Sequence, residues 1–125
     1  MDDKIARRFG GVIRLYGEAG FAALQRAHVA VVGVGGVGSW VVEALARSGV
    51  GQLTLIDLDH VALSNVNRQL PALSSTLGQA KVQTLQARVQ DINPLAQVTL
   101  IEDFVSAENV ADYLPAGKFS YVVDA

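Results

Sequence analysis

The amino-acid sequence predicts an α/β protein with a Rossmann-like, doubly wound parallel sheet, of which these 125 residues form the first half. Short runs of apolar and β-branched residues alternate with stretches in which apolar residues recur at helical spacing. The first of these runs leads directly into a cluster of glycines. Strands that alternate with helices pair in parallel through right-handed crossovers, so we expect the strand order 3-2-1-4.

The first 27 residues are expected to form helices that precede the sheet. Residues 3–10 are typical of a short polar helix, and residues 18–26 of a second helix in which Phe21, Leu24 and Ala22 face inward. Residues 28–125 then carry the βα units of the sheet. We therefore interpret residues 1–125 as a single domain, which is long enough to bury a core.

The strand and helix that flank the glycines come next. Residues 29–32 are a continuous apolar run, as expected for a strand that is buried on both faces. The following helix is predicted over residues 36–47, with Gly49 as a left-handed cap after its end.

The same alternation continues to the end of the sequence. Pro94 is expected to end the second of the sheet's helices, and Ser106 is expected to cap the third. The predicted elements are a strand over 52–57, a helix over 78–92, a strand over 97–104, a short helix over 106–114 and a strand over 119–125.

Composition and charge exclude several functions. A net charge of −2 provides no general attraction to nucleic acid or to anionic membranes. No apolar run approaches the roughly 20 residues of a membrane-spanning helix, and the first residues lack the pattern of a signal peptide, which favours a cytoplasmic protein without a membrane partner. The absence of cysteine excludes disulfides, thiolate zinc sites and a cysteine nucleophile. His28 and His60 are isolated in the sequence, so no metal site is predicted within the chain.

The glycine cluster predicts a phosphate-binding turn. In the sequence from Gly33 to Gly38, one glycine is expected to make the tight turn, a second to let backbone N–H groups approach phosphate, and Gly38 to let the helix pack closely on the strand. Phosphate then lies at a helix N-terminus. Asp57 follows the next strand at the position where a carboxylate hydrogen-bonds the ribose hydroxyls. The alternative is a glycine-rich turn that is purely structural.

The residues after Asp57 favour ATP over a dinucleotide. The pyrophosphate of NAD carries about two negative charges, whereas ATP carries about four and usually recruits arginine, lysine or a metal. Asn65, Arg68 and Lys81 are all expected near the carboxyl edge of the sheet. Taken singly, the two cations are also compatible with solvated surface charges. A dehydrogenase is disfavoured further because the chain offers no candidate acid or base for a hydride site.

The stretches GVGGVGSW, LIDLDHVALSNVNRQL, LGQAKV and INP resemble the ThiF/MoeB family, which is related to the ubiquitin-activating enzymes and adenylates carboxylates with ATP. The resemblance covers nearly the whole chain. It implies ATP and Mg²⁺ as cofactors and a homodimer as the assembly. It also implies that Arg68 and Lys81 act as the catalytic groups. The cofactor-binding residues that it implies are Gly33, Gly35, Gly36, Gly38, Asp57, Asp59, Asn65, Arg68, Gln69, Lys81 and Asp124.

Two flanking stretches, RRFGGVIRLYG and SAENVADYL, resemble one branch of this family, the tRNA threonylcarbamoyladenosine dehydratases. That branch activates the carboxylate of a modified tRNA base and cyclises it with loss of water. Two alternatives stay open. The first is adenylation of the C-terminus of a ubiquitin-like sulfur-carrier protein, and the second is a nucleotide-binding fragment without catalysis. The expected acceptor is therefore tRNA or a carrier protein.

The sequence departs from the family pattern at two places. In family members the strand that ends here at Asp124 continues through a D-x-x-D pattern whose second aspartate binds magnesium, so the magnesium ligand is expected beyond Ala125. Many relatives also supply an arginine from the N-terminal segment of the partner subunit, where this sequence has Gly11, with Arg14 or Arg8 as the candidate replacement. We therefore expect an N-terminal half that is inactive by itself, taken from a parent enzyme.

Overall fold

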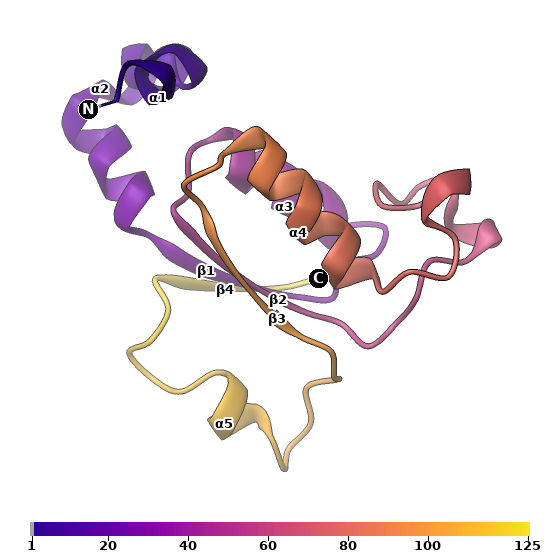
Figure 1. Cartoon of the computed structure of the whole chain (residues 1–125). Coiled ribbons are helices and arrows are strands. Elements are labelled where there is room, and N and C mark those ends of the chain that lie inside the picture. The colour runs from indigo at the N-terminus through magenta and orange to yellow at the C-terminus, as the bar shows by residue number, and fades with distance from the viewer. Residues whose placement is uncertain (1) are drawn as a thin grey trace.

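The computed structural model describes residues 2–125 and contains a four-stranded sheet in the order β3-β2-β1-β4 (Figure 1). All three strand pairings are parallel. The predicted fold class and strand order are therefore confirmed. The strands are β1 (His28–Val32), β2 (Gln52–Ile56), β3 (Gln97–Ile101) and β4 (Tyr121–Asp124).

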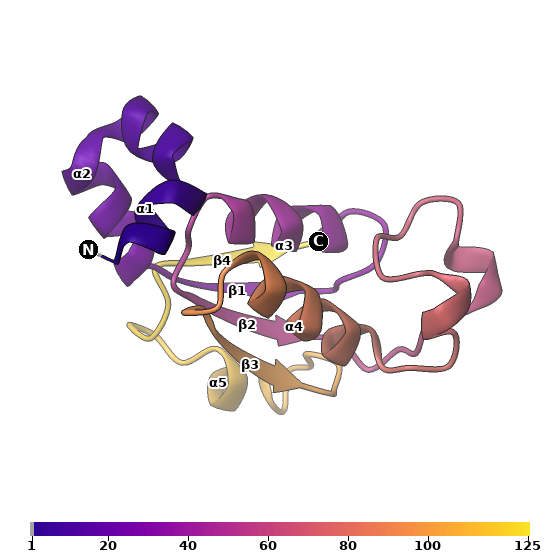
Figure 2. The same cartoon turned by 45° about the horizontal axis from the view of Figure 1, so that its top comes forward.

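The helices of the βα units lie where right-handed crossovers put them. Helix α3 (Gly38–Arg47) and helix α4 (Lys81–Ile92) lie side by side on one face of the sheet, and α5 (Val110–Tyr113) lies on the other side (Figure 2). The buried core fills the space between α3, α4 and the sheet. Its fully buried members include Val31, Val42, Leu53, Leu55, Val82, Leu85 and Val89.

Several predicted boundaries were wrong by a few residues. Helix α4 begins at Lys81 rather than at residue 78, because Gly78 has a left-handed φ of 82° and Ala80 forms a bridge with His60 instead of a helical turn. Strand β3 ends at Ile101 because its partner β2 ends at Ile56, so the residues that follow have no strand to pair with.

The predicted cap at Ser106 was also wrong. Helix α5 has only four residues, and Asn109 is its N-cap residue. Ser106 lies in the preceding turn, where its carbonyl accepts the Val110 N–H at 2.9 Å and its own N–H donates to the Asn109 side chain at 2.8 Å.

The N-terminal helices are more extensive than predicted. Helix α1 (Asp3–Arg8) is followed by α2 (Gly10–Arg26), which is interrupted at Gly17, where φ is 76° and ψ is 171°. The predicted helix over residues 18–26 is the half of α2 that follows this interruption. Ile5, Phe9 and Phe21 form a small separate cluster, with the two phenylalanine rings 5.5 Å apart. Among the three residues predicted to face inward, Phe21 is fully buried, and Leu24 and Ala22 are half-buried.

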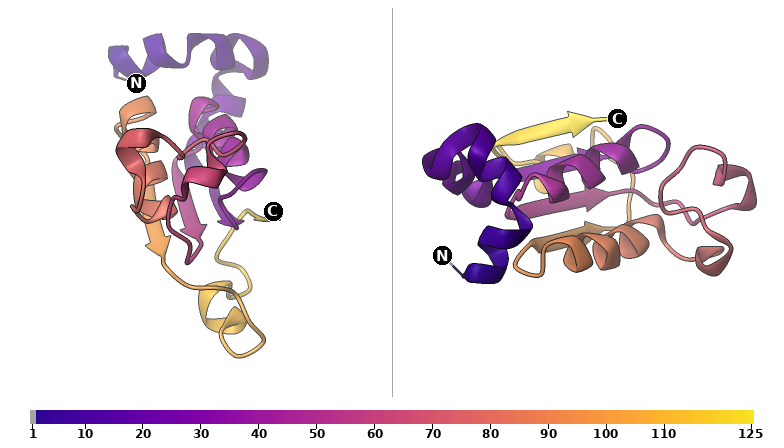
Figure 3. Two further views of the ribbon diagram at one scale, coloured as in Figure 1. Left: turned by 90° about the vertical axis from the view of Figure 1, so that its right-hand side faces the viewer. Right: turned by 90° about the horizontal axis from the view of Figure 1, so that it is seen from above.

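Different segments of the chain lie at the two ends of the sheet. Helix α2 joins the amino end of β1, whereas the long loop over residues 57–80 extends beyond the carboxyl ends of β1 and β2 (Figure 3).

Gly49 has a φ of 86°, as predicted for a left-handed cap, and a Cβ atom there would lie only 2.5 Å from the Phe21 ring. No helix within residues 2–125 is long and apolar enough to cross a membrane.

Candidate nucleotide-binding site

The glycine turn connects β1 to α3 at the carboxyl end of the sheet. Gly33 has a left-handed φ of 84°, which favours glycine. A Cβ atom at Gly38 would lie 1.7 Å from the Gly33 carbonyl oxygen, so only glycine fits where the helix begins against the turn. The sequence therefore places the first turn of α3 in direct contact with the backbone of the loop.

The backbone N–H groups of this turn are available to an anion. Ser39 N–H and Val41 N–H begin the helical hydrogen bonds, with acceptors at Gly35 and Val37. Within residues 2–125 the structure gives no acceptor to the N–H groups of Gly35, Gly36 and Val37. Unpaired N–H groups at the N-terminus of a ten-residue helix favour a phosphate.

Arg68 and Gln69 lie against the glycine turn, although they are more than 30 residues away in sequence. A Cβ atom at Gly36 would lie 3.6 Å from Cδ and Nε of Arg68, and one at Gly35 would lie 3.4 Å from Nε2 of Gln69. Arg68 is exposed, and its Nη1 donates to Asn67 Oδ1 at 2.9 Å and to the Ser64 carbonyl at 3.3 Å. Its other terminal nitrogen, Nη2, therefore remains for a ligand.

Two residues that the sequence reasoning missed hold Arg68 in place. Ser39 is fully buried, and its hydroxyl donates to the Gly35 carbonyl and accepts the Leu70 N–H at 3.3 Å. The indole Nε1 of Trp40 donates to the Arg68 carbonyl at 2.9 Å. The first turn of α3 thus fixes the glycine turn and the Arg68 segment to each other. The only signal in the sequence was a hydroxyl and an indole directly after the last glycine.

Asp57 is buried and braces the turn. Its Oδ2 accepts the Val34 N–H at 2.9 Å, and its Oδ1 accepts the Asp59 N–H at 2.8 Å. A carboxylate has about four lone-pair positions, so one position on each oxygen is left over. Asp57 therefore has a structural task in addition to the ribose contact that was predicted for it.

Lys81 is the first residue of α4 and is only 5% exposed. Its Nζ lies 3.9 Å from Oδ2 of Asp59, whose side chain is 59% exposed, so this ion pair is loose. A buried ammonium with one distant, solvated partner can take an additional anion. Asn65 is engaged in its own turn, where its Oδ1 accepts the Ala62 N–H at 2.9 Å.

A cavity of about 540 Å³ adjoins this cluster at the carboxyl ends of β1, β2 and β4. Four of the predicted residues line it: Gly33, Asp57, Asp59 and Asp124. Its opposite wall is largely apolar and comes from the segment that contains α5, which was not predicted to contribute. These apolar residues are Phe104, Val105, Val110 and Leu114. Such a cavity suits a flat base and its sugar.

The two candidate replacements for the partner arginine, Arg8 and Arg14, lie elsewhere. Arg8 donates from Nη1 to the Ile92 carbonyl at 3.1 Å, and Arg14 lies on α2, so within one chain both are at the opposite end of the sheet from the glycine turn (Figure 1).

His28 contacts Oγ1 of Thr54 at 2.8 Å, and burial lowers its pKa. Within residues 2–125 no three His, Cys, Asp or Glu side chains gather as a metal site.

The sheet order, the glycine turn and the free N–H groups at the start of α3 define a Rossmann-like nucleotide-binding fold. The chain belongs to the ThiF family, whose model matches residues 9–125. This confirms the family resemblance that the sequence motifs indicated.

Known relatives agree with this assignment. The chain is 54% identical over 123 residues to the tRNA threonylcarbamoyladenosine dehydratase of Haemophilus influenzae, covering 98% of this chain and 47% of that protein. It superposes with a TM-score of 0.96 on the crystal structure of the Escherichia coli tRNA N6-threonylcarbamoyladenosine dehydratase in complex with ATP, at 50% identity, covering 99% of this chain and 51% of that one.

A more distant relative belongs to the alternative that the sequence left open. The sulfur carrier protein adenylyltransferase of Thermus thermophilus is 36% identical over 109 residues, covering 87% of this chain and 40% of that protein. The chain thus spans about half the length of the curated relatives it matches.

Proposed function

We propose that this chain supplies the ATP-binding part of an enzyme that adenylates a carboxylate and thereby drives the cyclising dehydration of threonylcarbamoyladenosine in tRNA. The observation that carries the proposal is the glycine turn, where unpaired N–H groups lie beside the Arg68 side chain. The choice of reaction is supported by the higher identity to the dehydratase, 54%, than to the sulfur-carrier enzyme, 36%.

The proposed roles follow from the positions of the side chains. The N–H groups of Gly35 and Gly36 bind phosphate oxygens, while Arg68 and Lys81 offset the charge of the outer phosphates. The cavity beside Asp57 takes the nucleoside, and Asp59 and Asp124 line the same cavity. Gln69 lies against Gly35, and the Asn65 carbonyl accepts the Arg68 N–H in the turn that carries Arg68.

The proposed reaction has two steps. A carboxylate oxygen of the substrate attacks the α-phosphorus of ATP, and pyrophosphate leaves with its negative charge stabilised by the two cations. A nucleophile within the same modified base then attacks the activated carbonyl carbon, and AMP leaves with the former carboxylate oxygen. The ring closure therefore removes the elements of water overall.

Mg²⁺, a homodimer and a cytoplasmic location also belong to this proposal. Mg²⁺ prefers several oxygen ligands, and the side chains of residues 2–125 do not gather three of them, so the chain's own residues do not fit the ion as a complete site. A cytoplasmic location is consistent with a cysteine-free sequence and with a tRNA substrate.

Calorimetric titration of the 125-residue chain with ATP and with NAD tests the nucleotide. We expect binding of ATP and no comparable binding of NAD, and the reverse preference would contradict the proposal. In the longer parent enzyme, ATP–pyrophosphate exchange with threonylcarbamoyladenosine-containing tRNA or with a sulfur-carrier protein tests the acceptor. Exchange that depends on the carrier alone would favour the alternative function.

A further inference from the structure

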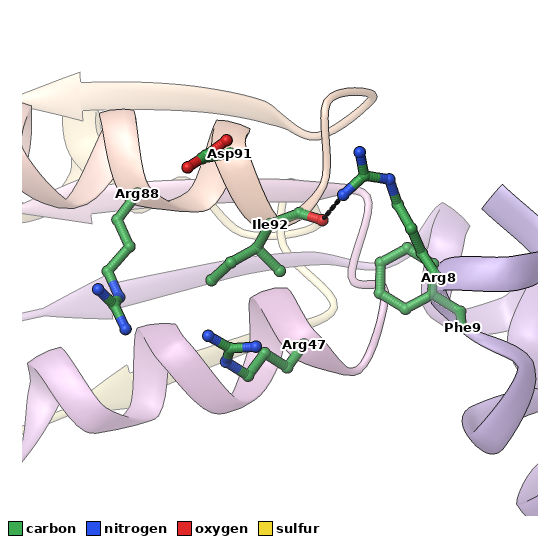
Figure 4. A pocket seen from close by; sticks show the side chains of 6 residues that line it. All are labelled: Arg8, Phe9, Arg47, Arg88, Asp91 and Ile92. Atoms are coloured by element: carbon green, nitrogen blue, oxygen red, sulfur yellow. Dashed lines mark hydrogen bonds between the residues drawn. The ribbon is translucent and has the colours of Figure 1, made fainter. Parts of the chain in front are cut away.

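A second cavity lies at the end of the sheet opposite the glycine turn. It has a volume of about 390 Å³ and is lined by three arginines from three helices (Figure 4). Since α3 begins at the glycine turn and Arg47 is its tenth residue, the cavity is about 15 Å away along the helix. Its lining residues are Arg8 of α1, Arg47 of α3, Arg88, Asp91 and Ile92 of α4, and Phe9.

The ion pairs at this cavity use only part of the guanidinium donors. Glu43 accepts from Nε of Arg47 at 2.7 Å, and from Nε and Nη2 of Arg88 at 2.6 and 2.9 Å. Arg8 donates from Nη1 to the Ile92 carbonyl at 3.1 Å. Each guanidinium carries five N–H donors, so both terminal nitrogens of Arg47 and most donors of Arg8 have no acceptor within residues 2–125.

The cavity also carries a local surplus of positive charge. Asp91 is the one carboxylate that lines the cavity beside the three guanidinium groups, while Glu43, outside the lining, pairs with Arg47 and Arg88, in a chain whose net charge is −2. The side chains of Arg47 and Arg88 are 59% and 44% exposed, so a ligand reaches them from solvent.

A purely structural account covers only part of these observations. Arginines near helix C-termini bind terminal carbonyl groups, which explains the bond from Arg8 to Ile92. This structural account does not explain why the terminal nitrogens of Arg47 face a cavity without an acceptor. Planar guanidinium groups with parallel free donors match the oxygens of a phosphate.

We propose that this cavity holds a backbone phosphate of the RNA substrate, an inference that rests on the proposed function. A single small anion binds weakly to such exposed groups, because solvent screens each pair. An RNA chain is different, because it is also held at the distant nucleotide-binding site. The contact between its phosphate and the arginines of this cavity then adds to the contacts made there. The cavity therefore contributes binding far from the reacting base and orients the RNA across the helices α3 and α4.

The test compares the binding of an unmodified tRNA transcript to variants of the 125-residue chain at several salt concentrations. We expect Arg47→Gln to weaken binding about 3- to 10-fold at low salt and to lower the slope of log K against log salt by about 0.7–0.9, the loss of one phosphate contact. Arg47→Lys retains the charge and should retain most of the slope. Arg7→Gln is the matched control, because this substitution removes the same charge. Arg7 is exposed near the same end of α1 as Arg8, but it does not line the cavity.

Arg8→Gln, on the opposite wall, provides a second variant if the thermal midpoint of Arg47→Gln falls. Equal affinities and slopes for the cavity variants and Arg7→Gln would overturn the inference, as would the absence of tRNA binding by the unchanged chain. Inorganic phosphate that competes for the cavity as strongly as tRNA would make it a small-anion site and overturn the RNA assignment. ATP titration of the same samples separates the two proposals, because a chain that fails to bind ATP but keeps the Arg47 effect contradicts only the proposed function.

Discussion

Arg68 is the residue on which the proposed use of ATP depends most directly. It lies against Gly36 with one terminal nitrogen free. Lys81 is buried, and its Nζ has only the distant carboxylate of Asp59, which lines the cavity. We expect Arg68→Ala or Lys81→Ala to weaken ATP binding by about 1.5–3 kcal/mol, the range of a charge-assisted hydrogen bond, and to leave AMP binding nearly unchanged. Calorimetry with both nucleotides measures the difference, with Arg7→Ala as a control. Equal losses for ATP and AMP would mean that these residues do not contact the outer phosphates.

Ser39 has a positioning role that can be separated from ligand contact. Its buried hydroxyl joins the Gly35 carbonyl to the Leu70 N–H, so Ser39→Ala leaves that N–H without its partner. We expect a loss of about 1–3 kcal/mol in the free energy of unfolding and weaker binding of ATP. The loss of ATP binding should be smaller in an Arg68→Ala background, because both changes then act through the same side chain. Additive losses of binding free energy in the double variant would contradict this role.

The glycine turn and the strand end at Asp57 were easier to predict from the sequence than the contacts around them. The glycines and Asp57 were predictable because local backbone geometry restricts their positions to glycine and to a strand end. The bonds of Ser39 to Leu70 and of Trp40 to Arg68 join residues about 30 positions apart. No periodic pattern encodes such contacts, so only the folded chain reveals them.

At the scale of elements, Glu43 ties α3 to α4. It accepts two bonds from Arg88 and one from Arg47, and the hydrogen bond from Arg88 is the main cause that lowers the pKa of Glu43 to about 2. Because the folded pKa lies below the ordinary value of 4.5, this stabilisation is present above about pH 4.5 and is lost as the pH falls toward 2.

We therefore expect the unchanged chain to lose about 1–2 kcal/mol more unfolding free energy between pH 6 and about pH 2.5 than Glu43→Gln does. Urea unfolding at both pH values measures this difference. Glu18→Gln, an exposed position on α2, is the matched control and should behave like the unchanged chain. The same acid sensitivity in Glu43→Gln as in the unchanged chain would exclude a stabilising role for the interhelical pair.

The elements that the sequence predicted well are those with a strong apolar pattern and a packed face. Strand β1 and helix α4 have such faces, and both pack against the main core. The start and the cap of helix α5 were mispredicted, because this helix has only four residues and no buried side chain. The first half of α2 was missed because the exposed, left-handed Gly17 interrupts its pattern.

At the scale of the whole molecule, the sheet has one apolar edge. Strand β4 pairs only with β1 in the described residues 2–125, and Tyr121 and Val122 on it are 74% and 47% exposed. It contains neither lysine nor proline, the residues that usually protect an edge strand from pairing with another chain. By contrast, the edge strand β3 carries the polar residues Gln97 and Thr99.

The 125-residue chain is therefore expected to self-associate through β4, with a dissociation constant in the micromolar range, about what a small and partly apolar interface supports. Val122→Lys adds a charge to this edge without replacing a residue of the main core, and we expect it to weaken association at least about tenfold. Thr99→Lys makes the same kind of change at the β3 edge and should leave association unchanged. Sedimentation velocity across a range of protein concentrations measures both variants. An unchanged chain that stays monomeric at about 100 μM, or equal effects of the two lysines, would show that β4 is not the edge through which the copies meet.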